Sequence, residues 1–185
     1  MRGDGGTAIA RRVAELVLDV PDFPQPGVVF KDLTPLLADP AGFRDVVDAI
    51  VEHHGPDTFD LVAGIEARGF VLAAGVAYAA GAGVVTVRKA GKLPRAVLSA
   101  AYALEYGEAV LEVHEDAFAA GPDRPRPRVL VVDDVLATGG TAAAALGLVE
   151  RAGGVVVGFS VLLELSFLAG RQRLPGRPVH ALLTV

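Results

Sequence analysis

Two adjacent carboxylates followed by a glycine-rich turn are the residues of this chain whose spacing best suits chemistry. Asp133 and Asp134 come directly after the apolar run 129–132, and Thr138-Gly139-Gly140-Thr141 precedes a helix pattern over 142–149. Glycines let the backbone approach an anion, and free N–H groups at a helix N-terminus point at it. The stretch therefore suits a ribose phosphate, with the acids on two vicinal hydroxyls and the phosphate in the loop. The alternative is an ordinary turn with two solvated acids.

Two commoner phosphate-binding patterns are absent from this stretch. No lysine follows the glycines, as a P-loop requires, and the spacing does not fit the G-x-G-x-x-G fingerprint. Phosphate binding here would therefore depend on backbone donors and on the hydroxyls of Thr138 and Thr141.

The composition excludes several classes of function. The 185 residues fit one domain, and a hydrophobic content of 52% is enough for a sizeable core. No long uncharged apolar run could cross a membrane, and the polar start lacks the apolar segment of a signal peptide, so we expect a cytoplasmic protein with no membrane partner. A net charge of −5 argues against nucleic-acid binding. Without cysteine there is no disulfide, thiolate metal site or cysteine nucleophile.

Hydrophobic periodicity predicts alternating strands and helices around the candidate residues. We expect helices over about 7–19, 39–54 and 70–80, and strands over 60–65, 84–88, 129–132, 155–163 and 178–185. Residues 97–104 and 109–115 flank Glu105-Tyr106-Gly107, which predicts a hairpin with a mobile tip. The alternation predicts an α/β fold: an open, mostly parallel twisted sheet flanked by helices.

A second candidate anion site combines a turn with a basic cluster. Arg68 lies in the turn 66–70, at the start of a predicted helix, and Arg88, Lys89 and Lys92 follow the end of a predicted strand. Active sites of open α/β sheets lie at such strand ends. The alternatives are a plain turn and a solvated charged face.

Two other stretches have plain structural interpretations. His53 and His54 end a predicted helix, where positive charge is tolerated, and we interpret them as a solvated helix end. A metal site is not expected, because no second cluster of possible ligands accompanies them at ligand spacing. Residue types over 22–37 favour a proline-rich connector with Phe30 in the core.

Several stretches together resemble the type I phosphoribosyltransferases, and in particular the members that use adenine. The run Asp133–Thr141 is similar to that family's motif for phosphoribosyl pyrophosphate (PRPP). Similar stretches are Gly64–Phe70, Arg88–Pro94, Tyr102–Gly107 and Glu164–Leu174. The resemblance implies one phosphoribosyltransferase domain over 1–185, with a hood formed by residues of about 20–37 and 96–116. It also implies a non-proline cis peptide near Glu66–Ala67.

The resemblance assigns roles to individual residues. Phe30 would stack on the purine, and Val29 and Lys31 would supply hydrogen bonds to the ring edge. Pyrophosphate would be bound by Arg68, Arg88, Lys89 and Lys92. Ribose would be held by Asp133 and Asp134, and its phosphate by the loop residues Ala137, Thr138, Gly139, Gly140 and Thr141. On the hairpin tip, Glu105 would act in catalysis and Tyr106 would orient the reactants.

The implied reaction transfers the phosphoribosyl group from PRPP to adenine and releases AMP and pyrophosphate. It implies Mg²⁺ bound mainly through substrate and water, near Asp133, with no direct protein ligand, and a homodimer. Ala137 stands where enzymes for 6-oxopurines place an acid, which favours adenine. Two alternatives stay open: transfer to another base, and a non-catalytic PRPP-sensing regulator of the same fold.

Overall fold

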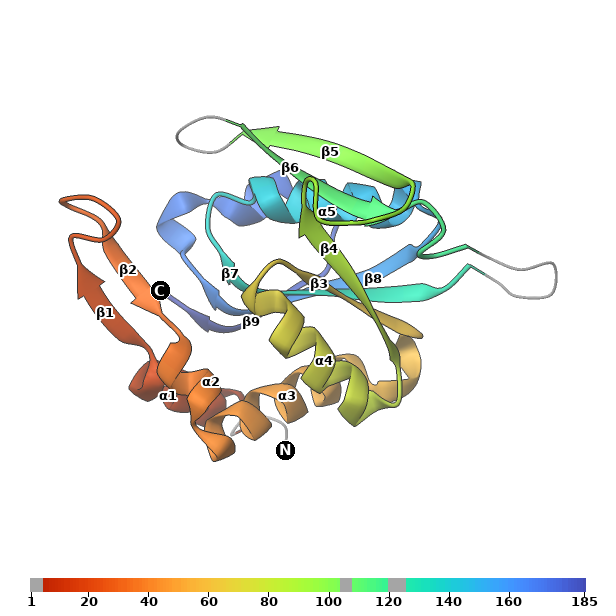
Figure 1. The fold of residues 1–185 in the computed structure, drawn as a ribbon. Helices are drawn as coiled ribbons and strands as arrows, with labels where there is room; N and C mark the ends of the chain where they lie inside the picture. The colour runs from red at the N-terminus through yellow and green to blue at the C-terminus, as the bar shows by residue number, and fades with distance from the viewer. Residues whose placement is uncertain (1–4, 104–107, 120–125) are drawn as a thin grey trace.

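A seven-stranded sheet forms the centre of the protein, in a computed structural model that describes residues 5–103, 108–119 and 126–185 (Figure 1). Its strand order is β5-β6-β4-β3-β7-β8-β9. Strands β4, β3, β7, β8 and β9 are parallel, and β6 joins β4 antiparallel. The strands are β3 (Leu61–Ile65), β4 (Gly83–Lys89), β5 (Val97–Ala103), β6 (Glu108–His114), β7 (Arg128–Leu136), β8 (Val155–Glu164) and β9 (Val179–Thr184). The predicted α/β architecture is confirmed.

Helices cover both faces of this sheet, as Figure 1 shows. Helices α1 (Gly5–Leu16), α3 (Pro40–His54) and α4 (Arg68–Ala80) lie on one face, and α5 (Gly140–Arg151) lies on the other. Successive residues of β7 explain this: Val129 and Val131 pack toward α5, whereas Leu130 and Val132 pack toward α3 and α4. All four are completely buried, as expected for a central strand of a parallel sheet.

The N-terminal region differs from the sequence prediction. The helix predicted over 7–19 ends at Leu16, and β1 (Leu18–Pro21) follows it. This strand pairs antiparallel with β2 (Val29–Asp32), and the five-residue helix α2 (Thr34–Ala38) comes next. The proline-rich connector predicted over 22–37 is confirmed over 22–28 only. Its remainder forms β2 and α2, because strand pairing between residues 18–21 and 29–32 satisfies backbone groups that short-range periodicity does not reveal.

Most of the remaining elements agree with the prediction. The hairpin β5–β6 forms, continues the main sheet through β4 and packs against α5. Asp39 caps α3 by accepting a hydrogen bond from Gly42 N at 2.6 Å, and β9 is an edge strand. The Glu66–Ala67 peptide bond is cis, as predicted. The tip residues Glu105 and Tyr106 lie outside the described residues.

No helix among the described residues has the length and apolar character needed to cross a bilayer.

Candidate active site

A cavity of about 370 Å³ lies beyond the C-terminal ends of β3 and β7. It is bordered by both predicted anion-binding turns. Its lining residues are Glu66, Ala67, Arg68, Lys89, Tyr102, Asp133, Asp134, Val135, Leu136, Ala137, Thr138, Gly139, Thr141 and Ala142. The structure thus brings together residues from four separate stretches of the sequence.

The acid pair is buried and lies within a strand. We predicted that the strand would end before Asp133, but β7 continues to Leu136, so both acids are part of it. Asp133 accepts a hydrogen bond from the backbone N–H of Asp134 at 2.9 Å. Burial raises the pKa of Asp133 well above its ordinary value, and the neighbouring Asp134 carboxylate raises it further. The interpretation as two solvated acids is therefore wrong.

The predicted phosphate loop, residues 137–141, is held by backbone contacts from a turn that is distant in the sequence. Gly139 has φ of +83°, immediately before α5, and the short 3₁₀ turn over Gly170–Arg173 lies against it. A Cβ atom on Gly139 would overlap the Gly170 carbonyl oxygen, and a Cβ on Gly170 would overlap the Ala137 carbonyl oxygen. Both positions therefore require glycine, because the two backbones meet without room for a side chain.

An ion pair anchors this supporting turn. The guanidinium of Arg171 forms two hydrogen bonds with the buried carboxylate of Glu164, one of them from Nε at 2.9 Å, and donates to the Val179 carbonyl at 2.8 Å. These bonds connect β8, the turn and β9. The backbone of Gly170 is thereby fixed next to the phosphate loop.

The second turn carries its charges on side chains. The carboxylate of Glu66 accepts hydrogen bonds from Lys92 Nζ and from the Lys89 N–H, the latter at 2.9 Å, and lies 3.5 Å from Arg88 Nε. The Lys92 ammonium holds the pKa of Glu66 below its ordinary value, against the effect of burial, and the Lys89 N–H assists. The predicted basic cluster thus converges on one carboxylate at the cavity wall.

Arg68 links the acid pair to the N-terminal hood. Its Nε donates to Asp134 Oδ2, and its guanidinium carbon lies 6.0 Å from the centre of the Phe30 ring. Arg68, which was predicted to bind pyrophosphate, is therefore paired in this structure with Asp134, which was predicted to bind ribose. Phe30 also contacts the Phe23 ring edge-on, with ring centres 5.2 Å apart. It therefore lies in the hood beside Arg68 and is not a core residue.

The other residues predicted for the base differ in position. Val29 is 52% exposed at the start of β2. The Lys31 ammonium is paired with Asp19 on β1 at 2.6 Å. Neither residue lines the cavity.

Sequence reasoning missed three residues that shape the cavity. Tyr102 reaches it from β5, Glu66 pairs with the cations, and Gly170 supports the loop. The alternation of β5 could have indicated Tyr102, because every second residue of a strand faces the same side. Nothing in the local sequence signals the contact of Gly170, which is 31 residues away from Gly139.

The interpretation of His53 and His54 as a solvated helix end is also wrong in part. His53 is exposed, but His54 and His180 are half-buried, and burial lowers the pKa of each of these two to about 4. His180 comes from β9 and stacks on His53, with ring centres 3.6 Å apart. A third histidine thus accompanies the pair in space, although not in sequence.

Comparisons with known proteins identify the family of this chain. Residues 32–174 match the family described as Phosphoribosyl transferase domain. Adenine phosphoribosyltransferase of Salinispora arenicola is 71% identical over 185 residues, 100% of this chain and 96% of that protein. The crystal structure of adenine phosphoribosyltransferase from Thermoanaerobacter pseudethanolicus has a TM-score of 0.88 at 43% identity, covering 95% of this chain and 99% of that one.

A third relative was solved with ligands. Adenine phosphoribosyltransferase of Saccharomyces cerevisiae, in complex with adenine and an imino-altritol bisphosphate, has a TM-score of 0.87 at 37% identity, covering 95% of this chain and 99% of that one. The family match covers more than half of the chain, and the relatives cover nearly all of it. This chain belongs to the phosphoribosyltransferase family, in its adenine phosphoribosyltransferase branch.

Proposed function

We propose that this protein is a purine-salvage enzyme that transfers the 5-phosphoribosyl group of PRPP to adenine, giving AMP and pyrophosphate. The observation that carries the proposal is that one cavity is bordered by the glycine-rich loop 137–141, a buried acid pair and a cation-bearing turn. These three elements match the phosphate, the ribose and the pyrophosphate of PRPP. The names of the relatives support adenine as the acceptor.

The proposed reaction is a displacement at the anomeric carbon. The bond from this carbon to the pyrophosphate oxygen breaks and its electron pair leaves with pyrophosphate, while N9 of adenine forms the new bond and loses its proton. The loop 137–141 holds the 5′-phosphate, Asp133 and Asp134 hold the ribose hydroxyls, and Arg68 and Lys89 face the leaving group. Catalysis then comes from positioning and charge stabilisation, without an enzyme nucleophile.

Magnesium is the proposed cofactor. When bound, Mg²⁺ would neutralise charge on the pyrophosphate oxygens, because it is a hard cation that prefers oxygen ligands and keeps several waters. Asp133 and Asp134 fit this role as the two carboxylates of the acid pair on the cavity wall, reaching the ion through water.

Glu105 is the proposed catalytic carboxylate, with Tyr106 beside it orienting the reactants. The described parts of β5 and β6 lead toward their segment, 104–107, and Tyr102 already lines the cavity. A carboxylate near the imidazole edge of adenine would stabilise the positive charge that develops as N9 reacts. Groups of this kind contribute about 10²–10⁴-fold, so Glu105→Ala should lower kcat by that factor in single-turnover measurements. A near-normal kcat would reject this role.

A purine panel tests the proposed function. Adenine, hypoxanthine and guanine are each supplied with PRPP and Mg²⁺, and nucleotide formation is measured. We expect adenine to be preferred by at least about 100-fold in kcat/KM, which is within reach of hydrogen-bond discrimination. Comparable activity on hypoxanthine would contradict the choice of base, and the absence of product with every base would favour the PRPP-sensing regulator.

We further propose that the chain is a cytoplasmic homodimer. Large apolar side chains are exposed on α4 and β4, namely Val71, Tyr78 and Val84 at 49%, 91% and 46% exposure. An apolar group of this kind often marks a protein–protein interface. Sedimentation equilibrium should give twice the 19.0 kDa chain mass, and a monomer at micromolar concentration would contradict the assembly.

A further inference from the structure

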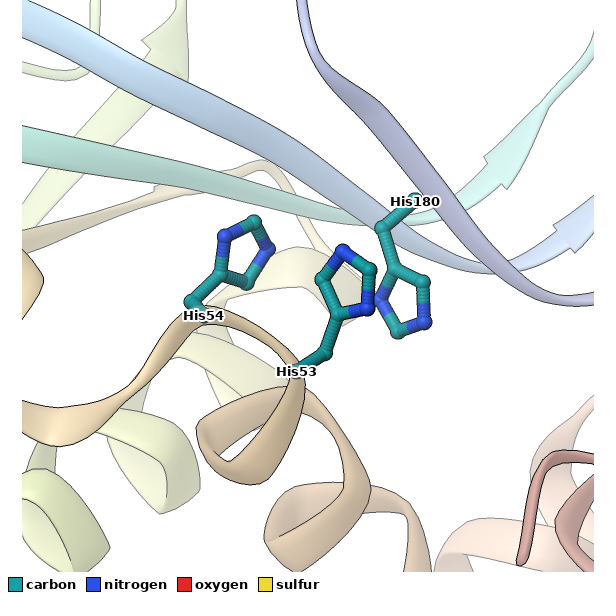
Figure 2. Close-up of side chains that lie close together, drawn as sticks. All are labelled: His53, His54 and His180. Carbon is teal, nitrogen blue, oxygen red and sulfur yellow. The ribbon is translucent and has the colours of Figure 1, made fainter. Parts of the chain in front are cut away.

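Three histidines from two distant segments come together on the sheet face that α3 covers (Figure 2). His53 and His54 end α3, and His180 lies on β9. One ring nitrogen from each lies within 4.8 Å of those of the other two. The cluster is separate from the cavity described above, whose lining includes none of these residues.

A buried serine holds two of the three rings. Ser160 on β8 is completely buried, and its Oγ lies 2.7 Å from His54 Nε2 and 3.4 Å from His180 Nδ1. Gly158, two residues earlier, makes room for the His54 ring, because a Cβ there would lie 2.7 Å from His54 Cε1. The two half-buried rings therefore each point a nitrogen atom at the Ser160 hydroxyl, which an ion would have to displace.

The third ring is free to adjust. His53 is exposed at the end of α3 and contacts His180 by flat stacking, with an angle of 4° between the rings. Parallel rings cannot both direct lone pairs at one ion, so His53 has to leave the stack to become a ligand. A tetrahedral ion with bonds of about 2.0–2.1 Å needs ligand nitrogens roughly 3.3 Å apart. The nitrogens, which lie within 4.8 Å of one another, would therefore have to move closer together to bind the ion.

We propose that His53, His54 and His180 form a binding site for a divalent transition-metal ion, with Zn²⁺ as the probe. Three neutral imidazoles suit zinc, copper or nickel, whereas Mg²⁺ prefers oxygen. The nearest cation that acts on His180 from another element is Arg171, and its charge is offset by the ion pair with Glu164. Water fills the fourth position, and the Ser160 hydroxyl holds the two half-buried rings until the ion takes its place.

A bound ion would fasten the end of α3 to the edge strand β9. The two elements meet through β8, which carries Ser160 between them. Because the site lies on the face opposite α5, its effect should be on stability and not on phosphoribosyl transfer. An ion that binds only the folded state raises the unfolding temperature, and above its Kd the increase grows with the logarithm of the free ion concentration.

The test is calorimetric titration of Zn²⁺ into the full chain, prepared without a histidine tag and treated with chelator. Excess Mg²⁺ in the buffer occupies the carboxylates of the cavity. We expect one equivalent of Zn²⁺ with a Kd of about 1 µM or lower, an increased unfolding temperature, and a tetrahedral absorption spectrum when Co²⁺ replaces Zn²⁺. The absence of saturable binding by the wild-type chain would overturn the proposal.

Single-residue variants locate the site. His53→Ala and His180→Ala should each weaken Zn²⁺ binding by at least about tenfold. His114→Ala is the matched control, since His114 is the remaining histidine of the chain and lies outside the cluster, on β6. Should His180→Ala fail to fold, the exposed His53→Ala still decides. Wild-type affinity in His53→Ala, or an equal loss in His114→Ala, would overturn the site.

Discussion

The two turns that border the cavity are both proposed to bind anions, but they offer different chemical groups. The loop 137–141 offers backbone groups in a fixed shape, and its rigidity comes from the backbone of Gly170 packed against it. The turn at Glu66–Arg68 offers long cationic side chains, and these are already paired with carboxylates of the protein: Lys92 and Arg88 with Glu66, and Arg68 with Asp134.

This difference implies different responses to substitution. The loop 137–141 tolerates no added side-chain atom at Gly139, because the neighbouring backbone cannot move away without losing its own hydrogen bonds. A set of paired side chains exchanges one partner for another, so changes there should be graded and sensitive to salt. The following predictions test that contrast, starting with the largest effect.

Gly139→Val should abolish PRPP binding while the fold survives. The added side chain meets the Gly170 carbonyl, and the positive φ at this position is strained for valine. Calorimetric titration with PRPP and Mg²⁺ measures the effect. Gly147→Ala, in α5 with open space around its Cα, is the control and should bind normally. Unchanged PRPP affinity in the valine variant would mean that this loop does not hold the phosphate.

Gly170→Ala should weaken PRPP binding through the loop, although Gly170 itself does not line the cavity. Its Cβ would overlap the Ala137 carbonyl, and a displacement of about 1 Å can cost roughly 100-fold. We expect KM for PRPP to increase by about 10- to 100-fold, with a smaller change in KM for adenine. Equal changes in the two KM values would show a general loss of structure and would contradict a specific role in loop position.

Glu66→Gln should strengthen pyrophosphate binding slightly. Removing the charge frees Lys92 and Arg88 from their present partner, and exposed ion pairs of this kind are worth about 0.2–1 kcal/mol, which is roughly two- to fivefold in Kd. The gain should shrink as salt is added. Weaker binding by the variant would show that the carboxylate positions the cations for the ligand, and the contrast between the two turns would then be smaller than proposed.

Asp133→Asn should raise the free energy of unfolding even as it harms PRPP binding. The raised pKa of Asp133 means that the folded protein holds a proton that the unfolded chain releases, so stability falls as pH rises above the ordinary value of 3.8. The neutral asparagine lacks this penalty, so its advantage should be larger at pH 8 than at pH 5. Urea unfolding at both pH values measures the advantage. If it were independent of pH, the proton held by Asp133 would not be its cause.

The sequence predicted the site best where local pattern determines it. The run from Asp133 to Thr141 identifies strand, loop and helix together, because glycines and small residues there have few other uses. The alternation of strands and helices and the hairpin also followed from periodicity. The end of the first helix and the pairing of β1 with β2 did not, since strand partners 8 to 14 residues away decide them.

Contacts between segments that are distant in the sequence could not be predicted from local sequence patterns. Gly170 looks like any glycine in a turn, and His180 is a lone histidine on a predicted strand. Only the folded chain shows that one supports Gly139 and that the other stacks on His53. The pairing of Lys92 with Glu66 is of the same kind, because it joins residues 26 apart across two strands.

The contact between Gly170 and the phosphate loop has a consequence for the growing polypeptide. The ribosome makes the loop more than thirty residues before it makes Val179, whose carbonyl anchors Arg171 and hence the turn that shapes Gly139. A nascent chain that has emerged from the ribosome only as far as α5 therefore carries the complete motif. It lacks the loop conformation that we propose binds PRPP. Competence for the substrate should appear late in translation and abruptly, when β9 docks on β8.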